Sequence, residues 1–194
     1  MAILELVKNA LLPVGDMLDL SASGSDAAVL VAIRELDGEA DLRLVFTRRP
    51  DHMRRHAGEV SFPGGKPEPG DDDLVHTALR EAHEELGIDP SDVEVLGGLP
   101  PISTFVTNYA VYPVVGRIAA DLPLKPHAGE VAAVLEYGLR DLVDVQQKKR
   151  YGRGPLTFES DVFDLDGNII WGATARILAT LIDRIGPDLA PPEG

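Results

Sequence analysis

Residues 80–88 read REAHEELGI and contain the second half of the clearest helix that the sequence predicts, together with the two residues that follow it. Residues three and four apart on a helix share one face, so Glu81, Glu84 and Glu85 are expected to project together, with Arg80 placed to pair with Glu84 and orient it. Three carboxylates on one face repel each other, and a divalent cation would neutralise them. Ligand sets made only of oxygen favour Mg²⁺ or Mn²⁺. For this stretch alone, a solvated acidic helix face explains the pattern equally well.

This helix is predicted to run over residues 74–86, between two strong boundary signals. Three aspartates, residues 71–73, precede it at the end where negative charge meets the positive pole of the helix dipole. Gly87 follows the last helical residue, and Pro90 comes shortly after, an order typical of a helix C-terminus.

A long segment rich in arginine, glycine and proline, residues 48–73, leads into the helix and contains Phe62-Pro63-Gly64-Gly65. Connections of this length inside a compact domain are usually functional. Adjacent glycines allow close approach of another group to the backbone and expose N–H groups. A glycine loop before a helix that carries carboxylates predicts a site in which a metal ion bridges the carboxylates and a diphosphate. Taken alone, the glycine pair is more often a turn.

The remaining elements predict a fold of the α+β (mixed α/β) class. Helices are expected at residues 3–12, 74–86 and 173–185, and strands at 27–35, 42–47, 93–99, 110–118, 130–137, 156–165 and 168–171. Asp37-Gly38 and Asp166-Gly167 are hairpin signals. Helices do not alternate regularly with strands, which argues against a doubly wound parallel sheet. We expect a single domain over residues 1–194, with its core at about 27–185, the N-terminal helix before it and a short C-terminal tail.

The composition excludes several classes of site. The 194 residues include 18 Lys+Arg and 32 Asp+Glu, for a formal net charge of −14, and no cysteine. No disulfide scaffold, thiolate zinc site, iron–sulfur cluster or cysteine nucleophile is therefore expected. The negative charge argues against binding to nucleic acid or anionic membrane. The sequence lacks the features of a secretory signal. It also lacks an apolar run long enough to form a membrane-spanning helix. We expect a cytoplasmic protein with a small-molecule substrate and no nucleic-acid or membrane partner; a homodimer is compatible with the sequence.

The stretch from Gly65 to Ile88 resembles the Nudix box, commonly written G-x5-E-x7-R-E-U-x-E-E-x-G-U. The matching residues are Gly65, an acidic residue at Asp71 or Asp72, Arg80-Glu81, Glu84-Glu85, Gly87 and Ile88. It departs from the motif in two ways. An aspartate replaces the first glutamate, and one extra residue separates Gly65 from Arg80. The second departure resembles the coenzyme A pyrophosphatase subgroup of the Nudix hydrolases, whose loop commonly begins FPGGxxD.

That subgroup has a second signature upstream, roughly L-L-T-x-R-[SA]-x3-R-x3-G-x3-F-P-G-G. The residues that match it are Thr47, Arg49, Arg54, Gly58 and Phe62-Pro63-Gly64-Gly65, while Val45-Phe46 replaces the leucines and Pro50 replaces Ser or Ala. Glu130-Val131 and the sequence IWGATA at residues 170–175 resemble two further segments of the subgroup. The resemblance covers roughly residues 28–182.

The resemblance implies a fold, a reaction and a cofactor. The fold would be a mixed β-sheet sandwiched between α-helices. The reaction would be metal-dependent hydrolysis of the diphosphate of coenzyme A, or of its thioesters, to 3′,5′-ADP and 4′-phosphopantetheine. Mg²⁺ or Mn²⁺ would neutralise the phosphate oxygens and lower the pKa of bound water.

Residue roles follow from the same resemblance. Glu81, Glu84 and Glu85 would hold metal, with Glu81 and Glu84 also counted as catalytic and Arg80 orienting the cluster. Gly64, Gly65, Arg49 and Arg54 would bind substrate, because the forked guanidinium group suits phosphate oxygens.

Three further assignments stay open. Glu130 is a candidate general base or additional ligand, or else an exposed residue that opens a strand, and Glu159 is an alternative base. A basic cluster, residues 148–153, is expected to be a solvated loop, although it could meet a 3′-phosphate.

Other functions remain as alternatives. One is a Nudix hydrolase of ADP-ribose, NADH or dinucleoside polyphosphates, against which the upstream arginine and glycine signature argues. Another is a non-catalytic Nudix-like module that binds nucleotide. The third is a binding protein whose acidic helix holds calcium.

Overall fold

This computed structural model describes residues 3–15, 26–35, 41–52, 56–103, 110–153 and 156–186. Among them the helices are α1 (Ile3–Ala10), α3 (Leu74–Leu86), α4 (Leu139–Val145), α5 (Gly172–Ile185) and the 3₁₀ helix η1 (Pro90–Asp92). The strands of the larger sheet are β1 (Ala27–Glu35), β2 (Leu42–Arg48), β3 (Val60–Ser61), β4 (Gly64–Gly65), β5 (Glu94–Gly98), β6 (Ile102–Ser103), β7 (Ala110–Ile118) and β8 (Ala133–Gly138). A smaller sheet contains β9 (Gln147–Arg153), β10 (Leu156–Leu165) and β11 (Asn168–Ile170).

The larger sheet is mixed. Its main strand order is β3-β2-β1-β7-β5, and β4 adds to β1, β6 to β7 and β8 to β2. β1 and β7 run parallel, from Ala27 opposite Val111 to Arg34 opposite Ile118, whereas β1 pairs with β2 and β4 in antiparallel fashion. The expected mixed α+β arrangement is confirmed.

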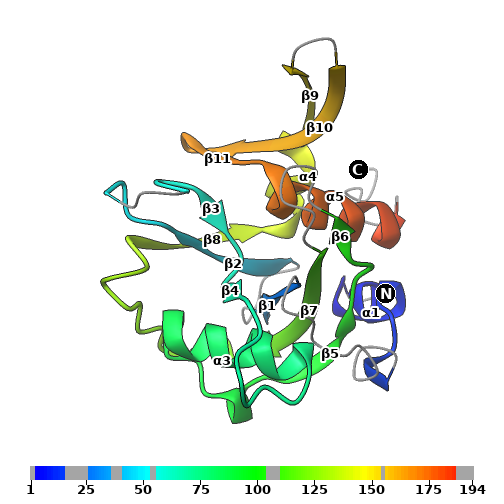
Figure 1. Cartoon of the computed structure of the whole chain (residues 1–194). Coiled ribbons are helices and arrows are strands. Elements are labelled where there is room, and N and C mark those ends of the chain that lie inside the picture. The colour runs from blue at the N-terminus through cyan, green and yellow to red at the C-terminus, as the bar shows by residue number, and fades with distance from the viewer. Residues whose placement is uncertain are drawn as a thin grey trace.

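Helices cover both faces of this sheet (Figure 1). Side chains alternate across a strand, and β1 contributes to both cores. Leu30 and Ala32 pack with α3 on one face, while Val31 and Ile33 pack with α1, α4 and α5 on the other. Burial on two faces explains why residues 27–33 of β1 are all apolar. The expected sandwich of helix, sheet and helix is therefore present.

Helix α3 begins and ends at the predicted residues. The Asp73 carboxylate accepts a hydrogen bond from the amide of His76, at 2.7 Å, and caps the helix start. Gly87 has φ 67°, in the left-handed region, and its amide donates to the carbonyl of His83. A side chain at a left-handed position is strained, so glycine suits this end.

Several predicted boundaries were wrong. The N-terminal helix ends at Ala10 rather than residue 12, because Leu12 pairs with Gly98 through two backbone hydrogen bonds of 2.8 and 3.1 Å. The strand predicted from Glu130 begins at Ala133, and Glu130 lies in the preceding turn. β3 and β4 lie inside the predicted long loop, and α4 was not predicted.

The prediction of a solvated loop for the basic cluster, residues 148–153, was wrong, because these residues form strand β9. β9 pairs with β10 along its whole length. Of the two predicted hairpin turns, the one at Asp166-Gly167 is confirmed, with φ values of 54° and 81° between β10 and β11. The turn expected at residues 37–38 lies outside the described residues. No described helix has the length and apolar character needed to span a membrane.

Candidate active site

The glycine strand β4 lies against helix α3. Ala28 and Val29 of β1 pair with Gly65 and Gly64, which fixes the position of β4 at the edge of the sheet. A side chain on Gly65 would overlap the carboxylate of Glu81, and one on Gly64 would overlap the backbone of β1. Both glycines are therefore required by close approach.

Arg80 connects the carboxylates of the site. Its Nε donates to Asp71 Oδ1 at 3.0 Å, and its Nη2 donates to the carbonyl of Lys66 at 2.9 Å. Its Nη1 lies 3.0 Å from Glu81 Oε1 and 3.2 Å from Glu84 Oε2. The guanidinium group thus ties the loop after β4 to one face of α3, as the sequence predicted for Glu84.

The three aspartates before α3 have different roles. The Asp71 side chain is only 2% exposed and accepts hydrogen bonds from Arg80, from the amide of Glu68 and from Thr77. Burial raises the pKa of Asp71, but these hydrogen bonds outweigh it and hold the pKa at about 2. In turn, the hydrogen bond to Asp71 raises the pKa of Arg80. Asp71, rather than Asp72, therefore occupies the position of the first acidic residue of the motif.

The three glutamates of α3 are not equivalent. The Glu84 side chain is 51% exposed and held by Arg80, whereas Glu85 is 6% exposed and buried beneath the surface. Glu85 Oε2 is buried and has no hydrogen-bond partner among the described residues. Burial and the charge of Glu81 raise the pKa of Glu85 to about 7. Burial likewise raises the pKa of Glu81, although Arg80 opposes the change.

Two groups from the upstream segment reach Glu85. The amide of Gly64 hydrogen-bonds to its carboxylate, and the positive charge of Arg49 stabilises its ionised form. Arg49 Nε is itself buried without a hydrogen-bond partner in the described part of the chain. Arg49 therefore faces the carboxylate cluster, whereas Arg54 lies outside the described residues.

Glu130 approaches the cluster from another segment. The amide of His127 donates to the carbonyl of Glu85 at 2.9 Å, and the amide of Lys125 donates to the carbonyl of Leu86 at 2.7 Å. The amide of Ala132 donates to the carbonyl of Arg48 at 2.8 Å, which ties the same segment to β2. The negative charge of Glu130 contributes to the raised pKa values of Glu81 and Glu85.

Glu159 and the basic cluster belong to a different region. Arg150 Nη2 lies 2.9 Å from Glu159 Oε1, and Lys148 Nζ lies 3.2 Å from Asp161 Oδ1. Figure 1 shows the hairpin of β9 and β10 projecting from the fold at the end opposite α3. The structure does not bring this hairpin to the α3 carboxylates.

The carboxylates fit a divalent cation through their chemistry. Within the described ranges, no three His, Asp or Glu side chains are placed to hold a metal ion, and Glu81 and Glu84 are each paired with Arg80. However, the buried and unpartnered Glu85 oxygen lies in a group of like charges, and a cation would satisfy it. Glu81 and Glu85 would hold Mg²⁺ together with water, which this ion retains readily, and Glu84 could join by turning away from Arg80.

Comparisons with known proteins give matches in both sequence and fold. The NUDIX domain family matches residues 24–153. The chain is 37% identical over 167 residues to a protein of Yersinia pestis (strain Pestoides F) named "Uncharacterized Nudix hydrolase NudL", covering 85% of this chain and 82% of that protein. A MutT/nudix family protein from Enterococcus faecalis is similar in structure, with a TM-score of 0.56 and 14% identity over 84% of this chain and 62% of that one. The Nudix hydrolase RenU of M. smegmatis is also similar in structure, with a TM-score of 0.52 and 16% identity. The match covers 64% of this chain and 81% of RenU.

Proposed function

This chain belongs to the Nudix family, and on that premise we propose that it is a metal-dependent pyrophosphohydrolase of coenzyme A or its thioesters. The products would be 3′,5′-ADP and 4′-phosphopantetheine. The observation that carries the proposal is the contact between the upstream signature and the carboxylates of α3. Gly64, from the upstream signature, lies against Glu85, and Gly65, which the signature shares with the helix motif, lies against Glu81.

The other residues of the upstream signature support the same site. Thr47 Oγ1 lies 3.3 Å from the carbonyl of Ser61 and donates to it, which joins β2 to the strand before the glycines. Gly58 has φ 69° in the turn between these strands, a conformation that favours glycine. Arg49 follows β2 and directs its charge to Glu85. These residues hold the arginine and the glycines of the signature around one carboxylate cluster.

The proposed reaction is attack of water on one phosphorus of the diphosphate. A new P–O bond forms from water, the bond from that phosphorus to the bridging oxygen breaks, and the released phosphate group carries the bridging oxygen away. A divalent metal would supply charge neutralisation of the phosphate oxygens and a lower pKa for bound water.

The protein would contribute positioning, charge and proton transfer. Glu81 and Glu85 would hold the cation, and Arg80 keeps Glu81 and Glu84 in place. Arg49 would contact phosphate oxygens with its guanidinium group. Glu130, on a separate segment, would accept the proton from the attacking water. This role suits a carboxylate that is exposed and lies near the cluster without being tied to Arg80.

A parallel substrate panel tests the proposal. Purified protein would be given coenzyme A, ADP-ribose, NADH and diadenosine polyphosphates, each with Mg²⁺, with Mn²⁺ and with EDTA. We expect metal-dependent turnover with coenzyme A preferred. Preference for ADP-ribose or a dinucleoside polyphosphate would keep the Nudix chemistry and overturn the substrate assignment. Binding of nucleotide without turnover of any compound would favour a non-catalytic module.

A further inference from the structure

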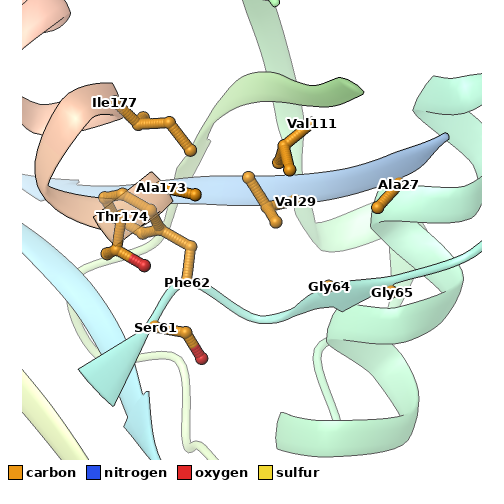
Figure 2. Close-up of a pocket in the computed structure, with 10 residues that line it drawn as sticks. All are labelled: Ala27, Val29, Ser61, Phe62, Gly64, Gly65, Val111, Ala173, Thr174 and Ile177. Atoms are coloured by element: carbon orange, nitrogen blue, oxygen red, sulfur yellow. The ribbon is translucent and has the colours of Figure 1, made fainter. Parts of the chain in front are cut away.

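A small cavity of about 170 Å³ opens beside the glycine strand. Figure 2 shows Ala173, Thr174 and Ile177 on one side of it and Gly64 and Gly65, next to α3, on the other. The cavity therefore lies between the start of α5 and the strand that touches the carboxylate cluster.

The cavity is apolar in character. Among the described residues, its lining contains no charged side chain, and its walls include Val29, Val111 and Ile177 from three different elements. Val29 and Val111 are only partly buried, so the described fold leaves apolar surface uncovered here. Concave apolar surface next to a polar site is typical of a ligand subsite.

One wall of the cavity is held firmly. The ring of Phe62 stacks on that of Phe46, with 4.7 Å between the ring centroids, and both residues are buried. Ser61, which precedes Phe62 in the chain, adds a hydroxyl group to the lining, and Thr174 adds another. The cavity thus combines a packed apolar wall at Phe62 with the hydroxyl groups of Ser61 and Thr174.

We propose that this cavity binds the branched apolar part of the pantetheine arm that adjoins the diphosphate, an inference that rests on the proposed function. Gly65 is the link, since its backbone lies against the Glu81 carboxylate and also lines the cavity. A group bound here must be only a few bonds from the diphosphate.

The chemistry of coenzyme A distinguishes its two halves. On the pantetheine side, a carbon with two methyl groups lies one CH₂ away from the diphosphate oxygen. On the other side, a ribose with its 3′-phosphate separates the diphosphate from adenine. An uncharged apolar cavity disfavours the phosphorylated half, because burial of an unpaired anion is costly. The dimethyl carbon matches both the position and the apolar lining.

The test fills the cavity and follows the two halves of the substrate separately. Ala173→Leu places extra methyl groups in the cavity, and Asp183→Leu is the matched control on an exposed position of the same helix. For each protein, inhibition constants for 4′-phosphopantetheine and 3′,5′-ADP would be measured against coenzyme A hydrolysis. We expect Ala173→Leu to raise the inhibition constant of 4′-phosphopantetheine by about tenfold or more, because extra methylenes that do not fit an apolar pocket weaken binding by this amount. Inhibition by 3′,5′-ADP should be unchanged, and the control should behave like the wild type.

A second variant and a measurement on the wild-type protein keep the test valid if Ala173→Leu does not fold. Ala173→Val adds less volume and should give a smaller change of the same kind. Saturation-transfer NMR on the wild-type protein with 4′-phosphopantetheine should give its two methyl resonances the strongest transfer. Equal transfer along the whole arm, unchanged inhibition constants in folded variants, or a selective loss of 3′,5′-ADP inhibition would each overturn the assignment. Wild-type protein that does not hydrolyse coenzyme A at all would instead overturn the proposed function, and with it this occupant.

Discussion

The carboxylate of Glu81 lies so close to the backbone of Gly65 that a methyl group on Gly65 would overlap it. The two residues come from different elements, one on strand β4 and one on helix α3. Their contact sets the spacing between the glycine strand and the carboxylate cluster. It also explains why glycine is needed at a position whose backbone conformation does not itself require it.

Gly65→Ala should therefore impair activity more than stability. The overlapping atoms belong to the end of a flexible glutamate side chain, which can turn away, but it then leaves its position in the site. We expect kcat to fall by about 10²-fold, the effect of a displacement of about 1 Å at a reacting centre. The melting temperature should change little. Gly64→Ala is the contrasting variant, because its side chain would overlap the backbone of β1 and should destabilise the fold. Normal activity of Gly65→Ala would contradict this account.

Asp71→Asn should destabilise the protein in a pH-dependent way. The pKa of Asp71 is lowered from 3.8 to about 2, so its charge stabilises the fold above pH 4. This contribution, about 2 kcal/mol, is lost as the pH falls through 2. The stability difference between wild type and Asp71→Asn should be constant from pH 8 to about 5 and shrink toward zero near pH 2.

Chemical denaturation at several pH values measures this difference. The neighbouring Asp72 is the matched control, since its side chain is 95% exposed. Asp72→Asn should leave stability within about 0.5 kcal/mol of the wild type at all pH values. An equal effect of both substitutions would refute the assignment of Asp71 as the partner of Arg80.

The α3 boundaries and the carboxylate motif could be predicted because their signals are local. Asp73 caps the helix and Gly87 ends it through hydrogen bonds to residues three and four positions away. The spacing of Glu81, Glu84 and Glu85 likewise predicted a shared face. It could not predict that Glu85 is buried while Glu84 is exposed, because that difference depends on what packs against the helix.

Long-range contacts account for most of what sequence reasoning missed. The sequence named Glu130 as a candidate base but left its position open. It lies near the cluster because residues 125–132 are tied by backbone hydrogen bonds to the end of α3 and to β2. Backbone hydrogen bonds leave no signature in the side chains. The apolar cavity was missed for a similar reason, since its walls come from segments far apart in the chain. Strand β9 lacks the alternation of apolar and polar residues that identifies a strand.

Glu85→Gln should abolish turnover and remove metal-dependent stabilisation. The substitution keeps the size of the side chain but removes the buried charge that the cation would satisfy. At a Mg²⁺ concentration about 100-fold above its Kd, the wild type should gain about 2.7 kcal/mol, seen as a higher melting temperature. The variant should gain much less. Glu84→Gln, at an exposed position held by Arg80, should show a smaller loss of both effects. Full activity of Glu85→Gln would rule out its role as a metal ligand.

Glu130→Gln should separate proton transfer from metal binding. We expect kcat to fall by about 10²-fold or more, as for loss of a general base, while Mg²⁺ still raises the melting temperature. Glu159→Gln is the comparison, because Glu159 pairs with Arg150 on the projecting hairpin. Its kcat should stay close to that of the wild type. A large loss for Glu159→Gln and none for Glu130→Gln would reverse the assignment of the base.

The central claim is metal-dependent cleavage of the coenzyme A diphosphate at the carboxylate cluster. Mass spectrometry of products formed in ¹⁸O-labelled water tests it most directly, with wild-type and Glu85→Gln proteins, each with Mg²⁺ and with EDTA. We predict that wild-type protein with Mg²⁺ yields 3′,5′-ADP and 4′-phosphopantetheine, one of which carries a single ¹⁸O atom, and that the other three reactions yield neither. Two results would contradict the claim. One is the same yield of products with EDTA as with Mg²⁺, and the other is a protein that hydrolyses another nucleotide but leaves coenzyme A intact.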